Sequence, residues 1–411
     1  MNTSPYHLFY GYGVELEYML VDKDSLNVKP IADDLLKFVL GKIGSDFENG
    51  IATWSNELVL HVIELKSTQP ESDLERLEKE FSRNITRINT ILSEWNAMLM
   101  PTAAHPFMDP FKETKLWPHD NNEVYERYNK IFDCSGHGWA NLQSTHLNLP
   151  FSGDEEFVKL HAAVRMILPL LPALCASSPI LDGHLTGMLD TRLRYYKTNQ
   201  SKIPSITGQV IPEAVFSYDD YKNTIYTPLE KDIEPYNTDN ILDPVWVNSR
   251  GAIARFDRGS IEIRIMDIQE CPAADLAIVN MVVELLKALV NEKFCSLYDQ
   301  MKMDTPTLSF IFDQMIVSGR QTLIDAPHYL AAFGLSSSVT ARELWKHILT
   351  KIPAHTHYEN KWQSVIHTLL DSGSLSERII TSIKQDDSHE HLKKIYSELS
   401  ACLAENRMFV P

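Results

Sequence analysis

The stretch from residue 12 to residue 21 reads YGVELEYMLV, an apolar run that contains two acidic residues. Its alternation predicts a β-strand, because successive side chains of a strand point to opposite faces of the sheet. Glu15 and Glu17 would share one face, and the apolar side chains between them would share the other. Burying two unpaired carboxylates is unfavourable, so their face must be solvated, matched by basic groups or neutralised by cations. Taken alone, the stretch also fits an ordinary antiparallel strand with one wet face.

A second stretch of this kind runs from residue 56 to residue 66 and reads NELVLHVIELK. Its β-branched and apolar residues predict one long strand or a pair of short strands. Glu57 and Glu64 lie seven positions apart, so they would face opposite sides of an unbroken strand. A β-bulge between them would give the two carboxylates a common face.

A third stretch, from residue 259 to residue 267, reads GSIEIRIMD. Glu262 and Arg264 alternate there with isoleucines, which again predicts a strand with one charged face and one apolar face. Together the three stretches predict one sheet whose charged face is lined with carboxylates and suits hard cations such as Mg²⁺ or Mn²⁺. The acids on that face are Glu15, Glu17, Glu57, Glu64 and Glu262.

Four short motifs follow one another along the chain: GVELE at 13–17, NEL at 56–58, AHPF at 104–107 and SIEIR at 260–264. In this order they resemble the type-two glutamate-cysteine ligase family of carboxylate-amine ligases, over roughly residues 10–290. The resemblance implies an α+β, glutamine-synthetase-like fold, with a curved, mostly antiparallel sheet and helices packed outside. We expect a catalytic domain over residues 1–295 and a helical C-terminal extension over residues 296–411, packed on the same domain.

The resemblance also implies a reaction. An enzyme of this family would use ATP with Mg²⁺, or Mn²⁺, to join L-glutamate to an amine such as L-cysteine through an acyl phosphate, as in glutathione biosynthesis. The metal ligands would be Glu15, Glu17, Glu57, Glu64, His146 and Glu262. Catalysis is assigned to Arg264, Glu57 and Arg250, and nucleotide binding to Arg255, Arg264 and Gln143. Binding of the substrate carboxylate is assigned to Arg192, Lys202 and Tyr195.

The histidine in this set comes from residues 139–149, which alternate well enough to predict another strand. His146 lies on one face with Asn148, whereas Gln143 falls on the opposite face. In the resembling family a strand at this place supplies a histidine or a glutamine to the metal and nucleotide cleft. Without the family, a single strand histidine is more often structural than a ligand.

Two basic clusters fit anionic substrates. Arg192 and Tyr195 follow a Ser-Pro turn, and Lys202 comes shortly after them. Arginine forks bind carboxylates and phosphates in two-point contacts. The family uses an arginine and a second basic residue here, and in this chain the second residue is Lys202, which leaves the mode of amino-acid binding open. A basic surface strip is the alternative.

The second basic cluster surrounds the third acidic stretch. Arg250, Arg255 and Arg258 precede Glu262, and Arg264 follows it. This mixture of cations and carboxylates predicts a place where phosphate meets metal. A structural network of salt bridges would produce the same pattern.

Composition excludes several classes of protein. The formal charge of −17 argues against nucleic-acid or anionic-membrane binding. Five scattered cysteines without a Cys-x-x-Cys motif indicate a reducing, cytoplasmic environment, and no signal peptide or membrane span is visible. No P-loop or dinucleotide-binding motif occurs. With 411 residues and no visible linker, we expect one elaborated domain.

Helical spacing predicts further elements. Helices are expected at 31–43, 72–98, 122–132, 155–177 and 272–294, with Asp33 and Asp34 capping the first and Ser72 with Glu75 forming a capping box on the second. We expect a flexible flap over 219–242 and a strand over 244–254. The C-terminal part should be helical at 308–316, 341–349, 358–370, 377–384 and 389–403, where it covers the sheet or forms a homodimer contact.

Two other functions remain open at this stage. The same site could serve a ligase whose acceptor is an amine other than cysteine, because no stretch visibly dictates a thiol pocket. The chain could also be a metal- or nucleotide-binding protein that keeps the fold without turnover.

Overall fold

The computed structural model describes residues 5–120, 122–352, 359–384 and 386–411. Within these residues an eight-stranded sheet forms the centre, in the order β2-β3-β4-β1-β6-β10-β9, with β5 paired to the end of β1. Neighbouring strands of this sheet are antiparallel, which confirms the predicted α+β class. The strands are β1 (Gly13–Asp22), β2 (Asp46–Asn49), β3 (Ala52–Asn56), β4 (Val62–Ser67), β5 (Ala97–Met100), β6 (Ser144–Pro150), β9 (Ala252–Arg255) and β10 (Ser260–Asp267).

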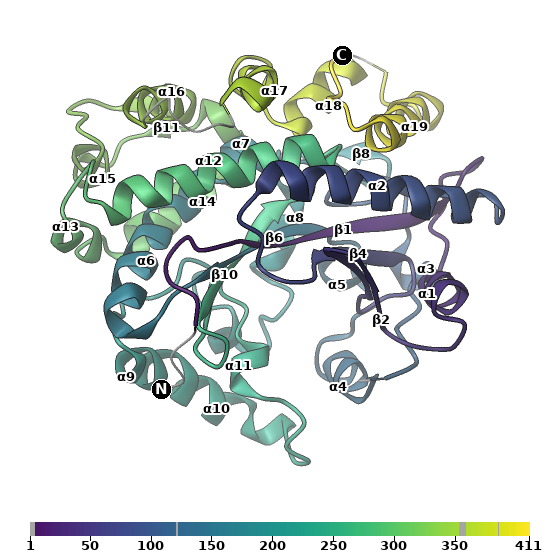
Figure 1. Ribbon diagram of the computed structural model, residues 1–411, viewed down its shortest axis with the longest axis horizontal. Coiled ribbons are helices and arrows are strands. Elements are labelled where there is room, and N and C mark those ends of the chain that lie inside the picture. Colours follow the sequence, from purple (N-terminus) through teal and green to yellow (C-terminus); the bar gives the residue numbers. More distant parts are fainter. Residues whose placement is uncertain (1–4, 121, 353–358, 385) are drawn as a thin grey trace.

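The apolar face of the sheet supports the main hydrophobic core. Val14, Leu16 and Tyr18 of β1 are completely buried in it. Two long helices, α2 (Leu74–Ser93) and α12 (Pro272–Val290), cross this face (Figure 1). Apolar residues recur every three or four positions along α2, so one stripe of that helix is buried, whereas α12 is buried on nearly all sides. The opposite face carries Glu15 and Glu17 near the start of β1, whereas Met19 and Val21, further along the same face, are buried in a second hydrophobic cluster.

Shorter helices surround the two ends of the sheet. Those before β9 are α1 (Ala32–Leu40), α3 (Pro110–Glu113), α4 (Asn122–Phe132), α5 (His137–Ala140), α6 (Gly153–Ile167), α7 (Pro172–Cys175), α8 (Thr191–Tyr196), α9 (Tyr218–Tyr221), α10 (Thr227–Ile233) and α11 (Pro244–Val247). The predicted helix over 155–177 is interrupted at its prolines, where α6 gives way to a 3₁₀ turn and α7. Two-stranded ribbons are formed by β7 (Ile180–Leu181) with β8 (His184–Leu185) and by β11 (Leu323–Ile324) with β12 (Val339–Thr340).

The C-terminal part is helical, as predicted, and Figure 1 shows its last four helices beyond α12 and α2. The helices are α13 (Leu297–Met301), α14 (Thr305–Ser318), α15 (Pro327–Ala332), α16 (Ala341–Lys351), α17 (Glu359–Asp371), α18 (Leu375–Ile383) and α19 (His389–Glu405). Residue 358, where one predicted helix begins, lies outside the described residues. The main core continues from β1 into this part of the chain. Across the described residues, each helix is too short or too polar to cross a membrane.

Several local predictions were wrong. Ile31, not an aspartate, precedes α1, and Asp73 rather than Ser72 caps α2 by accepting a hydrogen bond from the Arg76 amide. Residues 219–242 are largely helical, and 244–254 begins with α11 before β9 starts at Ala252. Prolines explain both errors, because Pro228, Pro235 and Pro244 occupy first turns of helices, where a missing N–H is tolerated.

Candidate active site

Strand register brings the predicted acids together on the polar face of the sheet. Glu15 of β1 lies opposite His146 of β6, and Glu17 lies opposite Glu64 of β4. β6 lies between β1 and β10, and Glu262 of β10 pairs with Asn148 of β6. Because directly opposed residues point to the same face, all these side chains gather above the centre of the sheet.

Glu15, His146 and Glu262 form the first of two acidic groups. Each offers a ligand atom, and these atoms lie within 4.8 Å of one another. The imidazole Nδ1 of His146 is 2.9 Å from Glu15 Oε2 and 3.8 Å from Glu262 Oε1. Asn148 donates to the second oxygen of Glu15 at 2.9 Å, which fixes the orientation of that carboxylate.

Glu17, Glu57 and Glu64 form the second group, with the same 4.8 Å limit between their ligand atoms. Glu17 Oε2 accepts hydrogen bonds from the amide and the hydroxyl of Ser144, at 2.6 and 2.9 Å. Glu57 lies in the connection between β3 and β4, so the predicted strand with a bulge was wrong. A hairpin loop, rather than a bulge, carries Glu57 to the same side as Glu64.

The charges in this cluster are only partly balanced. Burial raises the pKa of Glu57, and the charges of Glu17 and Glu64 raise it further. Burial and the charge of Glu15 raise the pKa of Glu64 to about 7, although Lys66 lies 3.1 Å away. Glu15 differs: burial would raise its pKa, but the hydrogen bond from His146 and the nearby cations lower it.

This donor set fits divalent metal ions. Carboxylates with one imidazole suit Mg²⁺ or Mn²⁺, and the ligand atoms within each group are close enough together to bind one ion. The raised pKa values of Glu57 and Glu64 reflect repulsion that a bound cation would relieve. The six metal ligands predicted from sequence therefore stand together, and their role as ligands remains our proposal.

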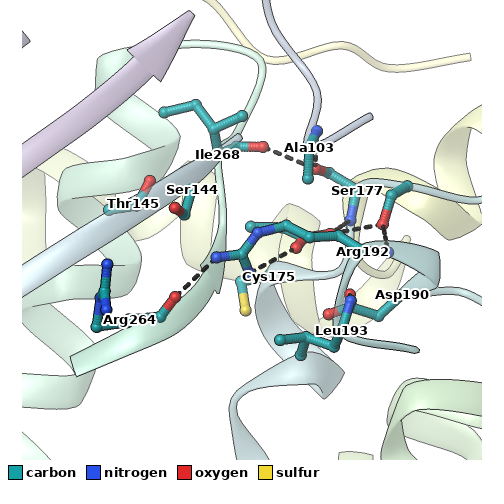
Figure 2. A network of polar contacts seen from close by, with 12 residues as sticks. Ala103, Ser144, Thr145, Cys175, Ser177, Asp190, Arg192, Leu193, Arg264 and Ile268 are labelled. Atoms are coloured by element: carbon teal, nitrogen blue, oxygen red, sulfur yellow. Dashed lines mark hydrogen bonds and ion pairs between the residues drawn. The ribbon is translucent and has the colours of Figure 1, made fainter. Parts of the chain in front are cut away.

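Two arginines border the acids. Arg264 of β10 places its Nε 3.1 Å from Glu262 Oε1. Arg192, from α8, donates to the backbone oxygen of Arg264 at 2.7 Å and to Asp267 Oδ1 at 3.2 Å (Figure 2). Its Nε has no hydrogen-bond partner among the described residues. Arg192 is thus a buried cation whose Nε is left for a ligand.

Asp267 holds the guanidinium of Arg192 in place, and Asp190 is the carboxyl group that interacts with Asp267. Asp267 also accepts from the Ser177 amide and the Ser178 hydroxyl, at 2.8 and 3.0 Å. Asp190 Oδ1 caps α8, whereas its Oδ2 has no hydrogen-bond partner among the described residues. Burial raises the pKa of both carboxyls, and the charge of Asp267 raises that of Asp190 further. Asp267, with three donors around it, is therefore the charged member of the pair.

A cavity of about 400 Å³, called the cleft below, opens beside these groups. On one side it reaches the acids and arginines, through Glu17, Glu57, His146, Arg192 and Arg264. On the other side it is lined by residues of α4 and α5 and of the segment around α11. The apolar and aromatic ones are Val124, Tyr125, Tyr128, Trp139, Leu142, Leu242, Trp246 and Val247, whereas Leu58 adjoins Glu57 in the β3–β4 connection. The cleft therefore joins a charged end to an aromatic end.

Five residues predicted for catalysis, nucleotide binding or substrate binding are not among those lining the cleft. Arg250 is bound to Glu213 at 2.6 Å, Lys202 is exposed and donates to a backbone oxygen at 3.1 Å, and Gln143 is completely buried just before β6. Tyr195 lines a separate surface hollow. Arg255 pairs with Ser260 across the strands, so it lies on the polar face with Glu262, and its guanidinium is 3.4 Å from Asp257.

Other residues in the cleft escaped the sequence analysis. Tyr196 lines it in place of its neighbour Tyr195, and Asn199, Gln200 and Trp246 line it as well. Helical spacing could have separated the two tyrosines, since adjacent residues of α8 point about 100° apart. Nothing in the sequence marks the two amides or Trp246, because their partners come from distant segments.

Comparison with known proteins agrees with this geometry. The sequence model described as "Glutamate-cysteine ligase family 2 (GCS2)" matches residues 12–398. The chain belongs to this family. A family relative from Archaeoglobus fulgidus, an uncharacterized protein, is 30% identical over 402 residues, which cover 97% of this chain and all of that protein. A Ruegeria pomeroyi relative named "Putative glutamate--cysteine ligase 2" is 25% identical, and the match covers 68% of this chain and 66% of the relative.

Solved structures share the fold of this family member. A bifunctional glutathione synthetase from Pasteurella multocida aligns with a TM-score of 0.64 and 14% identity, over 96% of this chain and 52% of that one. The glutamate–cysteine ligase of Francisella tularensis, solved with AMP, aligns with a TM-score of 0.57 and 12% identity, over 96% and 88%. The fold predicted from the resemblance is confirmed, and family membership places the chain among the carboxylate-amine ligases.

Proposed function

We propose that this protein is an ATP-dependent ligase that forms a γ-glutamyl amide through an acyl phosphate. One observation carries the proposal: two acidic groups, Arg264 and Arg192 converge from distant segments of the chain beside a single cleft. The chemistry needs such a site, because the triphosphate of ATP and the carboxylate of glutamate repel each other and have to meet.

Each side chain then has a defined task. Mg²⁺ held by the acids would offset the charge of the phosphate oxygens. Arg264 contacts the phosphoryl group in transfer, and Arg255 on the same face contacts the remaining phosphates. The free Nε of Arg192 donates to the α-carboxylate of glutamate, since this nitrogen has no other hydrogen-bond partner among the described residues.

The reaction proceeds in two transfers. A γ-carboxylate oxygen of glutamate attacks the γ-phosphorus of ATP, and ADP leaves as the bond to its bridging oxygen breaks. The amine nitrogen then attacks the carbonyl carbon of the acyl phosphate, and phosphate leaves. Glu57 lines the cleft, so we assign to its ionised carboxylate the proton that the amine releases.

Cysteine, the amine in the names of several relatives, is the reference acceptor. An acceptor other than cysteine is the second candidate, and the aromatic end of the cleft favours it. A homodimer in the cytoplasm remains part of the proposal.

Hydroxylamine gives a test that does not depend on the acceptor. With ATP, Mg²⁺ and L-glutamate it traps an acyl phosphate as γ-glutamyl hydroxamate, so we expect hydroxamate and an equal amount of ADP. D-glutamate and succinate serve as controls. Nucleotide binding without glutamate-dependent ADP release would instead identify a catalytically silent binding protein, and the proposed function would be wrong.

A further inference from the structure

The aromatic end of the cleft is built for an apolar group. Tyr128 of α4 and Trp139 of α5 meet edge to face, with ring centroids 5.5 Å apart. Leu142 and Leu242 line the same cavity, and Trp246 stands at its rim with 52% of its surface exposed. A large exposed aromatic at a cavity rim is typical of a surface that a ligand covers.

Two buried oxygen atoms beside this end lack a donor. Gln200, which is 4% exposed, uses its amide nitrogen to donate to Ser249 Oγ at 3.0 Å, and its Oε1 has no hydrogen-bond partner among the described residues. Asn199 likewise donates to the Gly138 oxygen at 2.9 Å and leaves its Oδ1 without one. Both residues line the cleft. A buried acceptor without a donor is unfavourable, so these oxygens suit the N–H groups of an amine.

The cleft offers no cation for a second carboxylate. Among the described residues that line it, the permanently charged cations are Arg192 and Arg264, which serve the glutamate and the phosphoryl group in the proposed function. Asp243, at the rim beside Trp246, would repel a carboxylate. The Nε1 of Trp139 has no hydrogen-bond partner in the part of the chain that the structure describes, but it is a neutral donor and does not compensate a buried charge. An amino acid acceptor such as cysteine would bring a second carboxylate, for which no arginine or lysine of the described cleft lining is left.

We propose that the acceptor is a primary amine that carries an aromatic group and no carboxylate, that is, an arylalkylamine. This inference rests on the proposed function and names its substrate class. The amine nitrogen donates to Asn199 and Gln200, and the ring packs against Trp139 and Trp246. Its nitrogen forms the amide bond with the carbonyl carbon of the acyl phosphate, the bond from that carbon to the phosphate oxygen breaks, and phosphate and one amine proton are released.

Four amines separate the two features of this proposal. Phenethylamine has the ring and lacks the carboxylate, phenylalanine has both, cysteamine has neither, and cysteine has the carboxylate alone. With ATP, Mg²⁺ and L-glutamate, we expect kcat/KM for phenethylamine to exceed that for phenylalanine and that for cysteamine by about tenfold or more, the range of discrimination that one pocket provides. Equal or faster ligation of cysteine or phenylalanine would overturn the proposal.

Two variants test whether the aromatic ring of the amine packs against Trp246. Trp246→Ala should lower the preference for phenethylamine over cysteamine by about tenfold. Phe310→Ala is the matched control, because Phe310 is 66% exposed and does not line the cleft. An unchanged preference in Trp246→Ala would contradict the assigned ring position.

Failure of the proposed function can be told apart from failure of this inference. Absence of hydroxamate with hydroxylamine would refute turnover, but it would not test which class of amine binds in the cleft. Calorimetry with phenethylamine and phenylalanine then decides the acceptor class by itself. Weaker binding of phenethylamine than of phenylalanine would overturn the inference, whatever the hydroxamate assay shows.

Discussion

Replacing Asp267 by Asn tests whether this carboxylate is the counterion that holds Arg192. The substitution keeps the size of the side chain and removes its charge, so the guanidinium stays buried without a charged partner. Breaking a buried ion pair in this way destabilises a protein by about 3–5 kcal/mol. We expect the lower end, about 3 kcal/mol, because Asp190 can ionise once the charge of Asp267 is gone.

Thermal unfolding measures this effect. Unfolding entropy is about 2 cal/mol/K per residue, which for 411 residues turns about 3 kcal/mol into a fall in Tm of about 3–4 °C. The KM for glutamate should also rise, since Arg192 is less well positioned. Asp190→Asn is the matched control: an amide resembles a protonated carboxyl, can cap α8 and can donate to Asp267, so its Tm should change by less than about 1 °C. A larger fall in Asp190→Asn than in Asp267→Asn would refute the assignment of the charge.

Three further predictions concern the acids, the metal and a buried histidine. Glu262→Gln should lower ligase activity by about 100-fold or more with little change in the circular dichroism spectrum, and unimpaired turnover would remove Glu262 from the metal site. Mg²⁺ at about 100 times its Kd at pH 8 should stabilise the protein by about 2.7 kcal/mol, and the same Mg²⁺ concentration should give a smaller increment in Tm at pH 6, because Glu57 and Glu64 must lose protons to bind. An equal increment at both pH values would contradict the raised pKa of Glu64. Burial lowers the pKa of His161 to about 3, so the unfolded chain takes up this proton first as the pH falls below about 6.5, and stability is lost. His161→Phe, which keeps the stacking on Phe157, should therefore remove about 2 kcal/mol of the loss between pH 7 and pH 5 in urea titrations, and an unchanged pH dependence would show that His161 is not the responsible group.

The fold was predictable where one periodicity dominated the sequence. The strict alternation in β1 and β10 identified both strands and the face that carries their acids. The segment around Val59 and His61 was wrongly predicted to be part of a strand, because it is as apolar as one. It turns instead, with Val59 bridging to Leu116 and the His61 ring bonded to the Ala140 oxygen, and both partners are distant in sequence.

The site was predictable only in its charged half. Glu15, Glu17 and Glu262 could be found because strand alternation fixes which side chains share a face. Arg250 could not be excluded, since Glu213, its partner, lies 37 positions away and nothing local announces the pair. The aromatic half depends on how α5 and α11 are brought together, which no short pattern encodes.

The last residues of the chain are bonded to the segment that follows β10. The Phe409 amide donates to Glu270 at 3.2 Å, and the buried Arg378 links Glu270 to the Phe409 oxygen. Glu270 stands three positions beyond Asp267, the residue that orients Arg192. Removing residues 408–411 would take away the backbone partners that Phe409 gives to Glu270 and Arg378, so expression designs that aim at an intact site should keep this segment.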